Sequence, residues 1–389
     1  MNQFFSTAIL VMGYNRHESL RKVLEALNKM KIDSNVDLII SIDGGGTTSV
    51  NKLVNEYNWS YGQKKVIIHS TRLGLKNHFI WAGDQTEFYD SILFLEDDIM
   101  PAPYALDVVK QMVSKYSSDD CIAAGSLYSP LLCEFVGSKF YKIHDGQDVF
   151  FLAHPYWGTI WMKNGWKLFK KWYETYEYNE NLLPTAVSQW KNNSSFKKIF
   201  IQYLAETQRT CVFPRVSYVT NLGVAGENAP MSTNCYQTVL SSYKPNLRMP
   251  EYALSESSYD VFMEILPKIL KKKFSELESY DFSVDLKQTR TFFSTPYLLT
   301  TRPVKKAIIT FSGRMKPFEN AIFFNMKGEG ISLARTEDVI ISDERDLIAA
   351  KDIRANYPLE PKTILYLMKM GFVKYINRRY ASFKKRRKK

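Results

Sequence analysis

The chain has 389 residues, 45% of them hydrophobic and 24% charged, an ordinary globular composition that allows one large domain and a smaller one. The formal net charge of +12 is concentrated in residues 361–389, which contain eleven Lys or Arg residues and no Asp or Glu. The remaining body is close to neutral, which excludes a nucleic-acid-binding domain with its own basic face and predicts no nucleic-acid partner.

The N-terminus and the cysteines indicate the compartment. The first residues carry no basic segment, and the apolar run at 8–12 is shorter than a signal-peptide core or a membrane span. We therefore expect a cytoplasmic protein without a transmembrane helix. None of the four cysteines forms a CxxC pair or has a His partner at a zinc-site interval, which fits a reducing compartment.

Strands and helices alternate along the first half of the chain. Short apolar runs bounded by turn residues predict buried strands, and apolar residues at helical spacing predict the helices between them. The predicted strands are 8–12, 36–42, 66–69, 91–95, 121–124 and 210–212, and the predicted helices are 20–30, 49–57, 77–85, 104–115, 163–176 and 195–208. This alternation predicts an α/β fold with a mostly parallel sheet, whose carboxyl-end loops build one crevice.

Polar residues follow the first two predicted strands. Asn15 and Arg16 come after the first strand, and Asp43 ends the second, so all three should lie at the carboxyl-end edge of the sheet. The glycines at 44–46 are not followed by a Lys-Ser/Thr pair, and no GxGxxG segment occurs. The sequence thus contains neither a P-loop nor a dinucleotide-binding fingerprint.

The strand at 91–95 ends in three consecutive carboxylates, Glu96, Asp97 and Asp98, and prolines at 101 and 103 are expected to stop further pairing. Three adjacent carboxylates repel one another unless a cation neutralises them. Their oxygens suit Mg²⁺ or Mn²⁺, and such an ion would in turn hold a diphosphate. The alternative is an acidic loop that caps the next helix, since acidic residues favour helix N-termini.

Two later segments could contribute to the same crevice. The aromatic segment 150–161 could line an acceptor subsite or could simply close the core. The segment 221–230 is rich in small residues, which is typical of a mobile loop over a site.

Taken together, the segments 8–16, 41–44, 94–103 and 155–158 resemble the GT-A glycosyltransferases, in particular the N-acetylglucosaminyltransferase I type and bacterial polysaccharide transferases built like it. The resemblance covers roughly residues 5–235. It implies a mixed, mostly parallel α/β sheet flanked by helices, here with a C-terminal extension. It also implies a metal-dependent enzyme that moves a sugar from a UDP-sugar donor to a glycan acceptor.

The resemblance also implies roles for individual residues. Arg16 and Asp43 would hold the uridine, and His78 would lie near its base. Glu96 and Asp97 would contact the ribose and the donor sugar, with Asp97 among the catalytic residues. Asp98 would bind Mn²⁺ or Mg²⁺ at the diphosphate. As alternatives, His78 is an ordinary helix histidine, and Arg16 or Asp43 is a capping residue.

The base that would take the acceptor proton is not assigned. Inverting members of the family place a catalytic Asp about one turn into the helix corresponding to 195–198, where this chain has lysines, and their glycine-rich loop often carries a His that 224–228 lacks. Asp145, Asp148, Glu206 and Glu227 are candidates for the base. The departure also permits a retaining transfer, or a protein that binds nucleotide or carbohydrate without turnover.

The remaining chain divides into a region of unknown fold at 251–360 and a tail at 361–389, after a transferase domain at 1–250. Residues 259–277 have a helical and basic pattern, and 305–342 has a strand-rich one. If the tail is helical, its apolar residues fall on one stripe beside a terminal polybasic run: Leu365, Met368, Phe372, Ile376 and Phe383. Such a helix would bind an anionic membrane surface, whereas the alternative is a solvated tail.

These expectations combine into one function. We expect a peripheral enzyme on the inner face of the cell membrane that extends a lipid-linked glycan in bacterial surface polysaccharide synthesis. The rival from another class is a non-catalytic nucleotide- or carbohydrate-binding protein on the same scaffold. Nucleotidyl transfer to a sugar phosphate is disfavoured, because the usual N-terminal glycine-rich signature is missing.

Overall fold

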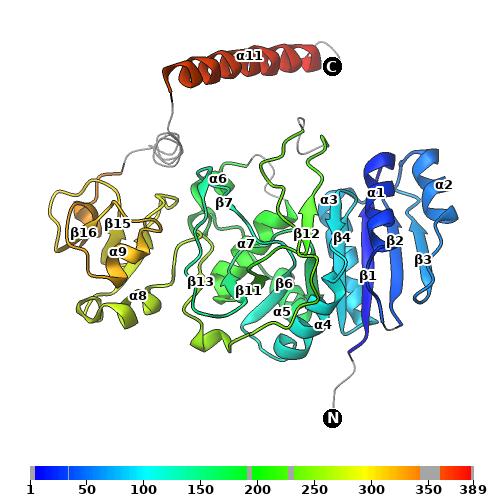
Figure 1. The fold of residues 1–389 in the computed structure, drawn as a ribbon, viewed down its shortest axis with the longest axis horizontal. Helices are drawn as coiled ribbons and strands as arrows, with labels where there is room; N and C mark the ends of the chain where they lie inside the picture. The colour runs from blue at the N-terminus through cyan, green and yellow to red at the C-terminus, as the bar shows by residue number, and fades with distance from the viewer. Residues whose placement is uncertain (1–4, 34, 191–194, 227–231, 342–359, 387–389) are drawn as a thin grey trace.

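The computed structural model describes residues 5–33, 35–190, 195–226, 232–341 and 360–386 (Figure 1). Its centre is a nine-stranded sheet with the order β13-β9-β11-β6-β10-β4-β1-β2-β3. The strands are β1 Thr7–Gly13, β2 Asp37–Ile42, β3 Lys64–Ile68, β4 Ser91–Glu96, β6 Ile122–Ser126, β9 Val149–Leu152, β10 Thr159–Met162, β11 Thr210–Pro214 and β13 Ser258–Tyr259.

Five of the eight strand pairs in this sheet are parallel. β3, β2, β1 and β4 run parallel to one another, β10 is antiparallel to both β4 and β6, and β11 returns to the direction of β6. β1 and β4 are apolar along almost their whole length because both faces of these central strands are covered. The fold class predicted from the sequence, a mixed and mostly parallel α/β sheet flanked by helices, is confirmed.

The helices of the main unit form two groups. α1 (His17–Leu27) packs on α2 (Thr48–Glu56), while α3 (Gly74–Asp84), α5 (Lys163–Tyr173) and α7 (Phe196–Thr207) pack together. The chain steps outward from β1 to β3 and then returns across the sheet to β4, so right-handed crossovers place the two groups on opposite faces. α4 (Ala105–Tyr116) follows the acidic triplet and packs on β4 and β6.

The interface between α3, α5 and α7 is built from aromatic side chains. Trp166 stacks on Phe196, and Trp161 packs edge-on against both Trp166 and Phe200. A Cβ at Gly83 would lie 2.2 Å from the Trp166 ring, so only glycine lets α3 approach α5 this closely. This packing holds the amino ends of α3 and α7 beside the carboxyl-end edge of the sheet.

The two prolines after the triplet do not end strand pairing, contrary to the expectation from the sequence. β5 (Ile99–Pro101) pairs antiparallel with β12 (Val219–Asn221), and the two form a separate ribbon. A two-stranded ribbon is all edge, which is where a proline is tolerated in a sheet.

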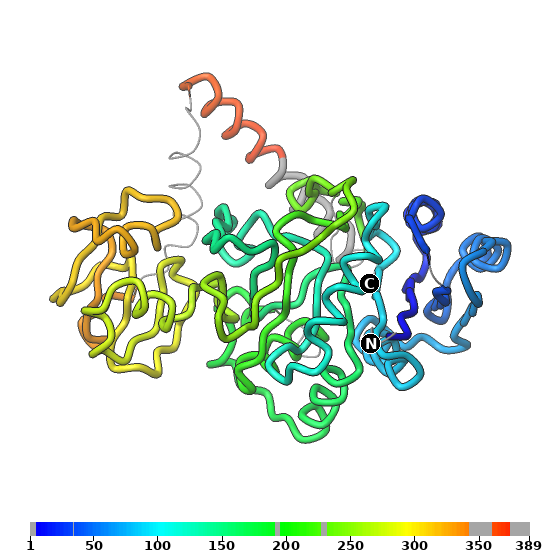
Figure 2. Tube along the Cα trace, turned by 60° about the horizontal axis from the view of Figure 1, so that its bottom comes forward, coloured from blue at the N-terminus to red at the C-terminus, as the bar shows by residue number. Residues whose placement is uncertain are grey.

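A smaller four-stranded sheet follows the main one, with the order β14-β15-β17-β16 (Figure 2, yellow to orange). Its elements are α8 Pro267–Lys273, β14 Phe282–Asp285, β15 Tyr297–Thr300, β16 Ile309–Ser312, α9 Glu319–Phe323 and β17 Gly330–Arg335. The helical pattern expected over 259–277 is realised in α8 and in the short 3-10 helix Ser275–Leu277, since β13 joins the main sheet and Pro267 starts α8. A buried ion cluster joins Lys287 of this unit to Glu319 and to Glu264, which lies between β13 and α8.

The last described element is α11, the helix Pro361–Arg386, which stands apart from both sheets (Figures 1 and 2). Of the expected apolar stripe, the side chains of Ile376 and Phe383 lie outside the described residues. Between 364 and 373 the exposed apolar residues are Ile364, Leu365, Tyr366, Leu367, Met368, Met370, Phe372 and Val373. Among the helices that the structure describes, none is long and apolar enough to cross a membrane.

Candidate active site

The carboxyl ends of three neighbouring strands meet at one place. Gly13 of β1 is level with Ile42 of β2, and Met12 of β1 is level with Glu96 of β4. The residues that follow these positions therefore emerge side by side. This register brings Arg16, Asp43 and the acidic triplet to the same edge of the sheet, as the strand-end rule predicts.

A cavity of about 280 Å³ lies at this edge. It is lined by all six residues that the sequence singled out as donor- or metal-binding: Arg16, Asp43, His78, Glu96, Asp97 and Asp98. The other lining residues are Met12, Gly13, Tyr14, Asn15, Arg72, Leu75, Trp157, Asn221, Gly223, Val224, Gly226, Thr233 and Tyr236.

Arg16 joins the two aspartates of the triplet. Its Nη1 donates to Asp98 Oδ2 at 2.8 Å, and its Nη2 pairs with Asp97 Oδ1. Asp97 and Asp98 are only 5% and 8% exposed, so this guanidinium supplies charge compensation that water cannot. Burial raises the pKa of Asp97, although Arg16 acts in the opposite direction.

Glu96 has the most perturbed carboxyl of the triplet. Burial, followed by the negative charges of Asp98 and Asp97, raises its pKa to about 8, against the opposing effect of Arg16 and Lys197. Glu96 is therefore largely protonated at neutral pH. The triplet then carries two negative charges against one arginine, and the surplus of about one negative charge favours an additional cation.

Asp43 is held by backbone N–H groups. Its Oδ1 accepts from Gly44 at 2.8 Å and from Leu73 at 2.7 Å, and its Oδ2 accepts from Gly74 at 3.1 Å. Leu73 and Gly74 begin α3, so the carboxylate satisfies free donors at that helix start. Asp43 thus anchors the turn that forms one wall of the cavity.

His78 lies on α3 with its ring buried. Its Nε2 is 2.7 Å from the Ser41 hydroxyl, which also contacts His69 at 3.0 Å. Burial lowers the pKa of His78 to about 4, so the imidazole is neutral at pH 7. His78 therefore presents an uncharged ring to the cavity.

Arg16 is the residue that precedes α1, but its guanidinium has only N–H donors and cannot accept from the free N–H groups at the helix start; it pairs with the triplet instead. The far wall comes from the segment after β12. Leu222 N donates to the Asp98 carbonyl at 2.8 Å, and a Cβ at Gly226 would lie 3.2 Å from Arg16 Nη1. The loop 222–226 therefore lies over the arginine, while Glu227, one of the expected bases, is outside the described residues.

Arg72 and Tyr236 are lining residues that were not singled out from the sequence, whereas Trp157 belongs to the segment 150–161 that was expected either to line an acceptor subsite or to close the core. Arg72 lies with its guanidinium 4.6 Å from the centre of the Tyr14 ring, and Trp157 packs on Tyr236 at 5.5 Å. Arg72 follows the carboxyl end of β3, so the strand-end rule could have found it. Tyr236 has no such signal, because it reaches the cavity from a long irregular segment.

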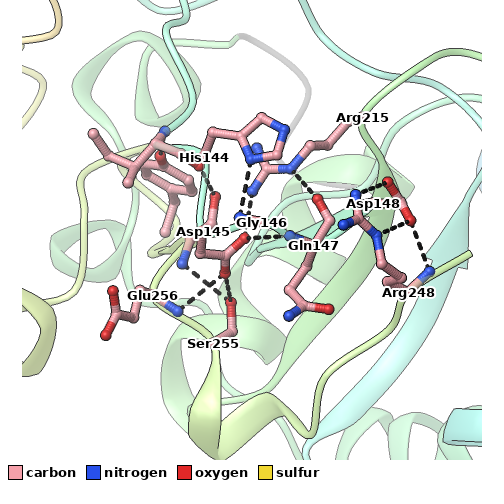
Figure 3. Close-up of polar contacts among 12 residues, drawn as sticks. His144, Asp145, Gly146, Gln147, Asp148, Arg215, Arg248, Ser255 and Glu256 are labelled. Atoms are coloured by element: carbon pink, nitrogen blue, oxygen red, sulfur yellow. Dashed lines mark hydrogen bonds and ion pairs between the residues drawn. The ribbon is translucent and has the colours of Figure 1, made fainter.

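The structure does not bring Asp145 or Asp148 to the cavity. Figure 3 shows both in a loop that is tied to the segment 248–256. Asp145 accepts from Arg215 at 2.8 Å and from Ser255 Oγ at 3.2 Å, and Asp148 accepts from Arg248 Nε at 3.0 Å. Each of these carboxylates has its own arginine, and together they fasten one loop to the next.

Glu206 also lies away from the cavity. It accepts from Trp172 Nε1 at 2.7 Å near the carboxyl end of α7, about 13 Å along the helix from Lys197. The lysines at the start of α7 are both engaged: Lys197 pairs with Glu134, and Lys198 is buried and donates to the Ser188 carbonyl at 3.0 Å. None of the candidate bases in the described part of the chain, Asp145, Asp148 and Glu206, lines the cavity.

The donor set suits one mode of metal binding. Within the described residues no group of three or more His, Cys, Asp or Glu side chains could enclose a metal ion. Mg²⁺, however, is usually held by one or two carboxylates together with substrate phosphates and water. Asp97 and Asp98 fit that mode.

The fold and the site together define an α/β protein with a ligand cavity at the carboxyl ends of parallel strands, walled by an acidic triplet and two arginines. No protein-family model and no curated protein matches the chain. Solved structures do.

One match is S. aureus TarS 1-349, at 13% identity and a TM-score of 0.36, over 55% of this chain and 59% of that one. The same protein in complex with UDP-GlcNAc matches at 14% identity and a TM-score of 0.40, over 57% and 60%. The mannosyltransferase PcManGT from Pyrobaculum calidifontis, in complex with GDP-Man and Mn²⁺, matches at 10% and 0.32, over 43% and 47%. The chain spans less than two-thirds of each of these structures.

Proposed function

We propose that the protein is a metal-dependent glycosyltransferase that uses a UDP-sugar donor. The observation that carries the proposal is the convergence in one cavity of Arg16, Asp43, His78 and the acidic triplet, from four different segments of the chain. The cavity combines a neutral ring, surplus negative charge and two arginines. A nucleoside diphosphate with a divalent cation would complement these three features.

In this proposal the walls have separate tasks. His78 and the turn anchored by Asp43 face the nucleoside, and Arg72 pairs with phosphate oxygens, for which a guanidinium is well suited. Glu96 and Asp97 contact the ribose and the donor sugar. Asp98, with Asp97, would hold Mn²⁺ or Mg²⁺, and the ion would neutralise the charge that develops on the departing UDP.

We further propose that the acceptor is a glycan, lipid-linked and presented at the inner face of a bacterial membrane in surface polysaccharide synthesis. The supporting observation is α11, which exposes apolar residues around its first turns next to Lys362 and Lys369 and continues into the polybasic end of the sequence. Apolar and basic residues together favour anionic lipid surfaces. Removing residues 361–389 should abolish pelleting with anionic liposomes and leave UDP affinity unchanged; unchanged pelleting would contradict membrane binding.

The first test is calorimetric titration of UDP into the protein with Mn²⁺ and with EDTA, followed by UDP release from UDP-sugars in the same sample. Binding that requires Mn²⁺, with slow UDP release, is the expected result. Absence of UDP binding under both conditions would overturn the donor site.

The alternative function is a non-catalytic nucleotide- or sugar-binding protein. One observation favours it: Lys197 and Lys198 stand at the start of α7, and both are engaged with other groups. The same experiment separates the two functions, because a binding protein would take up UDP without cleaving any UDP-sugar.

A further inference from the structure

A partly buried polar cluster beside the cavity, in which the Lys197 side chain is 32% exposed, takes no part in the donor site described above. It consists of Glu134, Lys197 and His154, and it joins the hairpin β7 (Leu132–Cys133) and β8 (Ser138–Lys139) to α7. Lys197 Nζ lies 2.8 and 2.9 Å from the two carboxylate oxygens of Glu134, and His154 Nε2 lies 2.7 Å from Oε1. Glu134 keeps 13% of its side chain exposed, whereas His154 is fully buried.

The charges in this cluster are defined by its surroundings. Burial lowers the pKa of His154, so the ring is neutral at pH 7 and donates to the carboxylate from Nε2. Burial alone would raise the pKa of Glu134, but Lys197 and His154 bring it down to about 2. Glu134 is therefore ionised at every working pH and held in place by two donors.

The cluster adjoins the cavity through aromatic side chains. Lys197 Nζ lies 4.8 Å from the centre of the Tyr156 ring, and that ring contacts Trp157, which lines the cavity, at 6.2 Å. The cluster also acts electrostatically on both walls: Lys197 lowers the pKa of Glu96, and Glu134 contributes to the raised pKa of Tyr236. Like Asp145, Asp148 and Glu206, Glu134 is not among the residues that line the cavity; it differs from them in lying directly behind the aromatic wall, on the side of α7.

We propose that Glu134 is the carboxylate that receives the proton of the acceptor hydroxyl, with Lys197 and His154 as its positioning residues. This inference rests on the proposed transferase function and goes beyond it by naming the acceptor side of the site. The acceptor O–H bond breaks and its proton goes to Glu134, while the oxygen forms a bond to the anomeric carbon of the donor. The bond from that carbon to the diphosphate breaks, and its electron pair leaves with UDP.

The weak basicity of Glu134 is compatible with this role. Glycosyl transfer proceeds through a transition state with oxocarbenium character, in which the new bond makes the attacking oxygen strongly acidic. A weakly basic carboxylate can take the proton at that stage. Positioned proton transfer of this kind contributes on the order of 10²- to 10⁴-fold to a rate.

The test measures UDP release from UDP-N-acetylglucosamine, UDP-glucose and UDP-galactose with Mn²⁺, where water serves as the acceptor. Glu134→Gln keeps the size of the side chain but cannot take a proton, so release should fall by about 10²-fold with UDP affinity unchanged. Asp148→Asn is the matched control, since it also removes a carboxylate that faces a basic side chain, and it should leave release unchanged.

Lys197→Met provides a second measurement, a pH profile of UDP release that a merely structural role of Glu134 would leave unchanged. Removing the ammonium raises the pKa of Glu134 toward its ordinary value of about 4.3. The ratio of the variant rate to the wild-type rate should then fall as the pH decreases from about 6 to about 4. Thermal melting and UDP titration identify any variant that has lost its fold. If Glu134→Gln has lost its fold, the pH profile of Lys197→Met tests the proposal in its place.

Each outcome has a defined meaning. Release by Glu134→Gln above a third of the wild-type rate, or a pH-independent Lys197→Met ratio, overturns the role of Glu134. Wild-type protein that binds UDP but releases it from no donor also overturns that role and leaves a binding protein. Wild-type protein that binds no UDP overturns the proposed function itself.

Discussion

Two regions of the molecule bring carboxylates and arginines together, and they differ in how the charges balance. In the loop of Figure 3, Asp145 faces Arg215 and Asp148 faces Arg248, one arginine for each carboxylate. At the cavity, a single arginine, Arg16, serves two aspartates that stand next to Glu96. Balanced pairs hold segments together, whereas a surplus of negative charge in a cavity favours the cation that we propose to bind there.

The largest expected effect tests the surplus of negative charge at the cavity directly. Asp98→Ala should weaken Mn²⁺-dependent UDP binding by about 10²-fold or more, because charge-assisted contacts to a cation lose their anionic partner. Isothermal titration measures the affinity, and circular dichroism verifies the fold. UDP affinity equal to that of the wild type would mean that the surplus charge has no ligand.

The balanced region should respond in stability instead. Asp145→Asn leaves Arg215, whose side chain is only 12% exposed, without its counter-charge. We expect a loss of about 3 kcal/mol in the free energy of unfolding, measured by urea denaturation, with UDP affinity unchanged. A drop in UDP affinity of the folded variant would contradict the separation of the two regions.

A smaller effect concerns the pH dependence of the free energy of unfolding that comes from His78, a residue of the cavity wall. The pKa of His78 is about 4 in the folded protein and about 6.5 when unfolded, so the unfolded chain binds more protons between these values. Stability from this residue is complete above about pH 6.5 and is lost as the pH falls to about 4, by up to about 3 kcal/mol. His78→Phe should flatten the unfolding free energy over this window, and an unaltered slope would contradict a buried neutral His78.

The smallest effect is expected at the exposed half of the balanced region. Asp148→Asn breaks a pair whose arginine is 67% exposed, so the free energy of unfolding should change by less than about 1 kcal/mol. Asp145→Asn measured in parallel serves as the reference. A larger loss at position 148 than at 145 would reverse the order set by burial.

Much of the fold and one side of the site could be predicted from the sequence. The central strands are continuous apolar runs, because they are buried on both faces, and the residues that follow such runs must lie at one edge. Arg16, Asp43 and the triplet were located by this reasoning alone. His78 required the resemblance, since nothing in its local pattern distinguishes it from any helix histidine.

The proposed acceptor side could not be predicted from the sequence, because it depends on contacts between distant segments. Glu134 and Lys197 are far apart in the chain, and only the packing of the β7–β8 hairpin against α7 joins them. The small sheet was predicted in part, because the strand-rich pattern of 305–342 contains β16 and β17, whereas β14 and β15 were not expected. Each of these two strands is only four residues long, and buried ions such as Lys287 and Glu264 give the surrounding sequence the character of a surface.

The ribbon of β5 and β12 links two parts of the site mechanically. The same backbone hydrogen bond that starts the loop 222–226 ends on the carbonyl of Asp98, so the loop and the triplet share one support. Displacing the loop 222–226 would therefore pull directly on the main chain of Asp98.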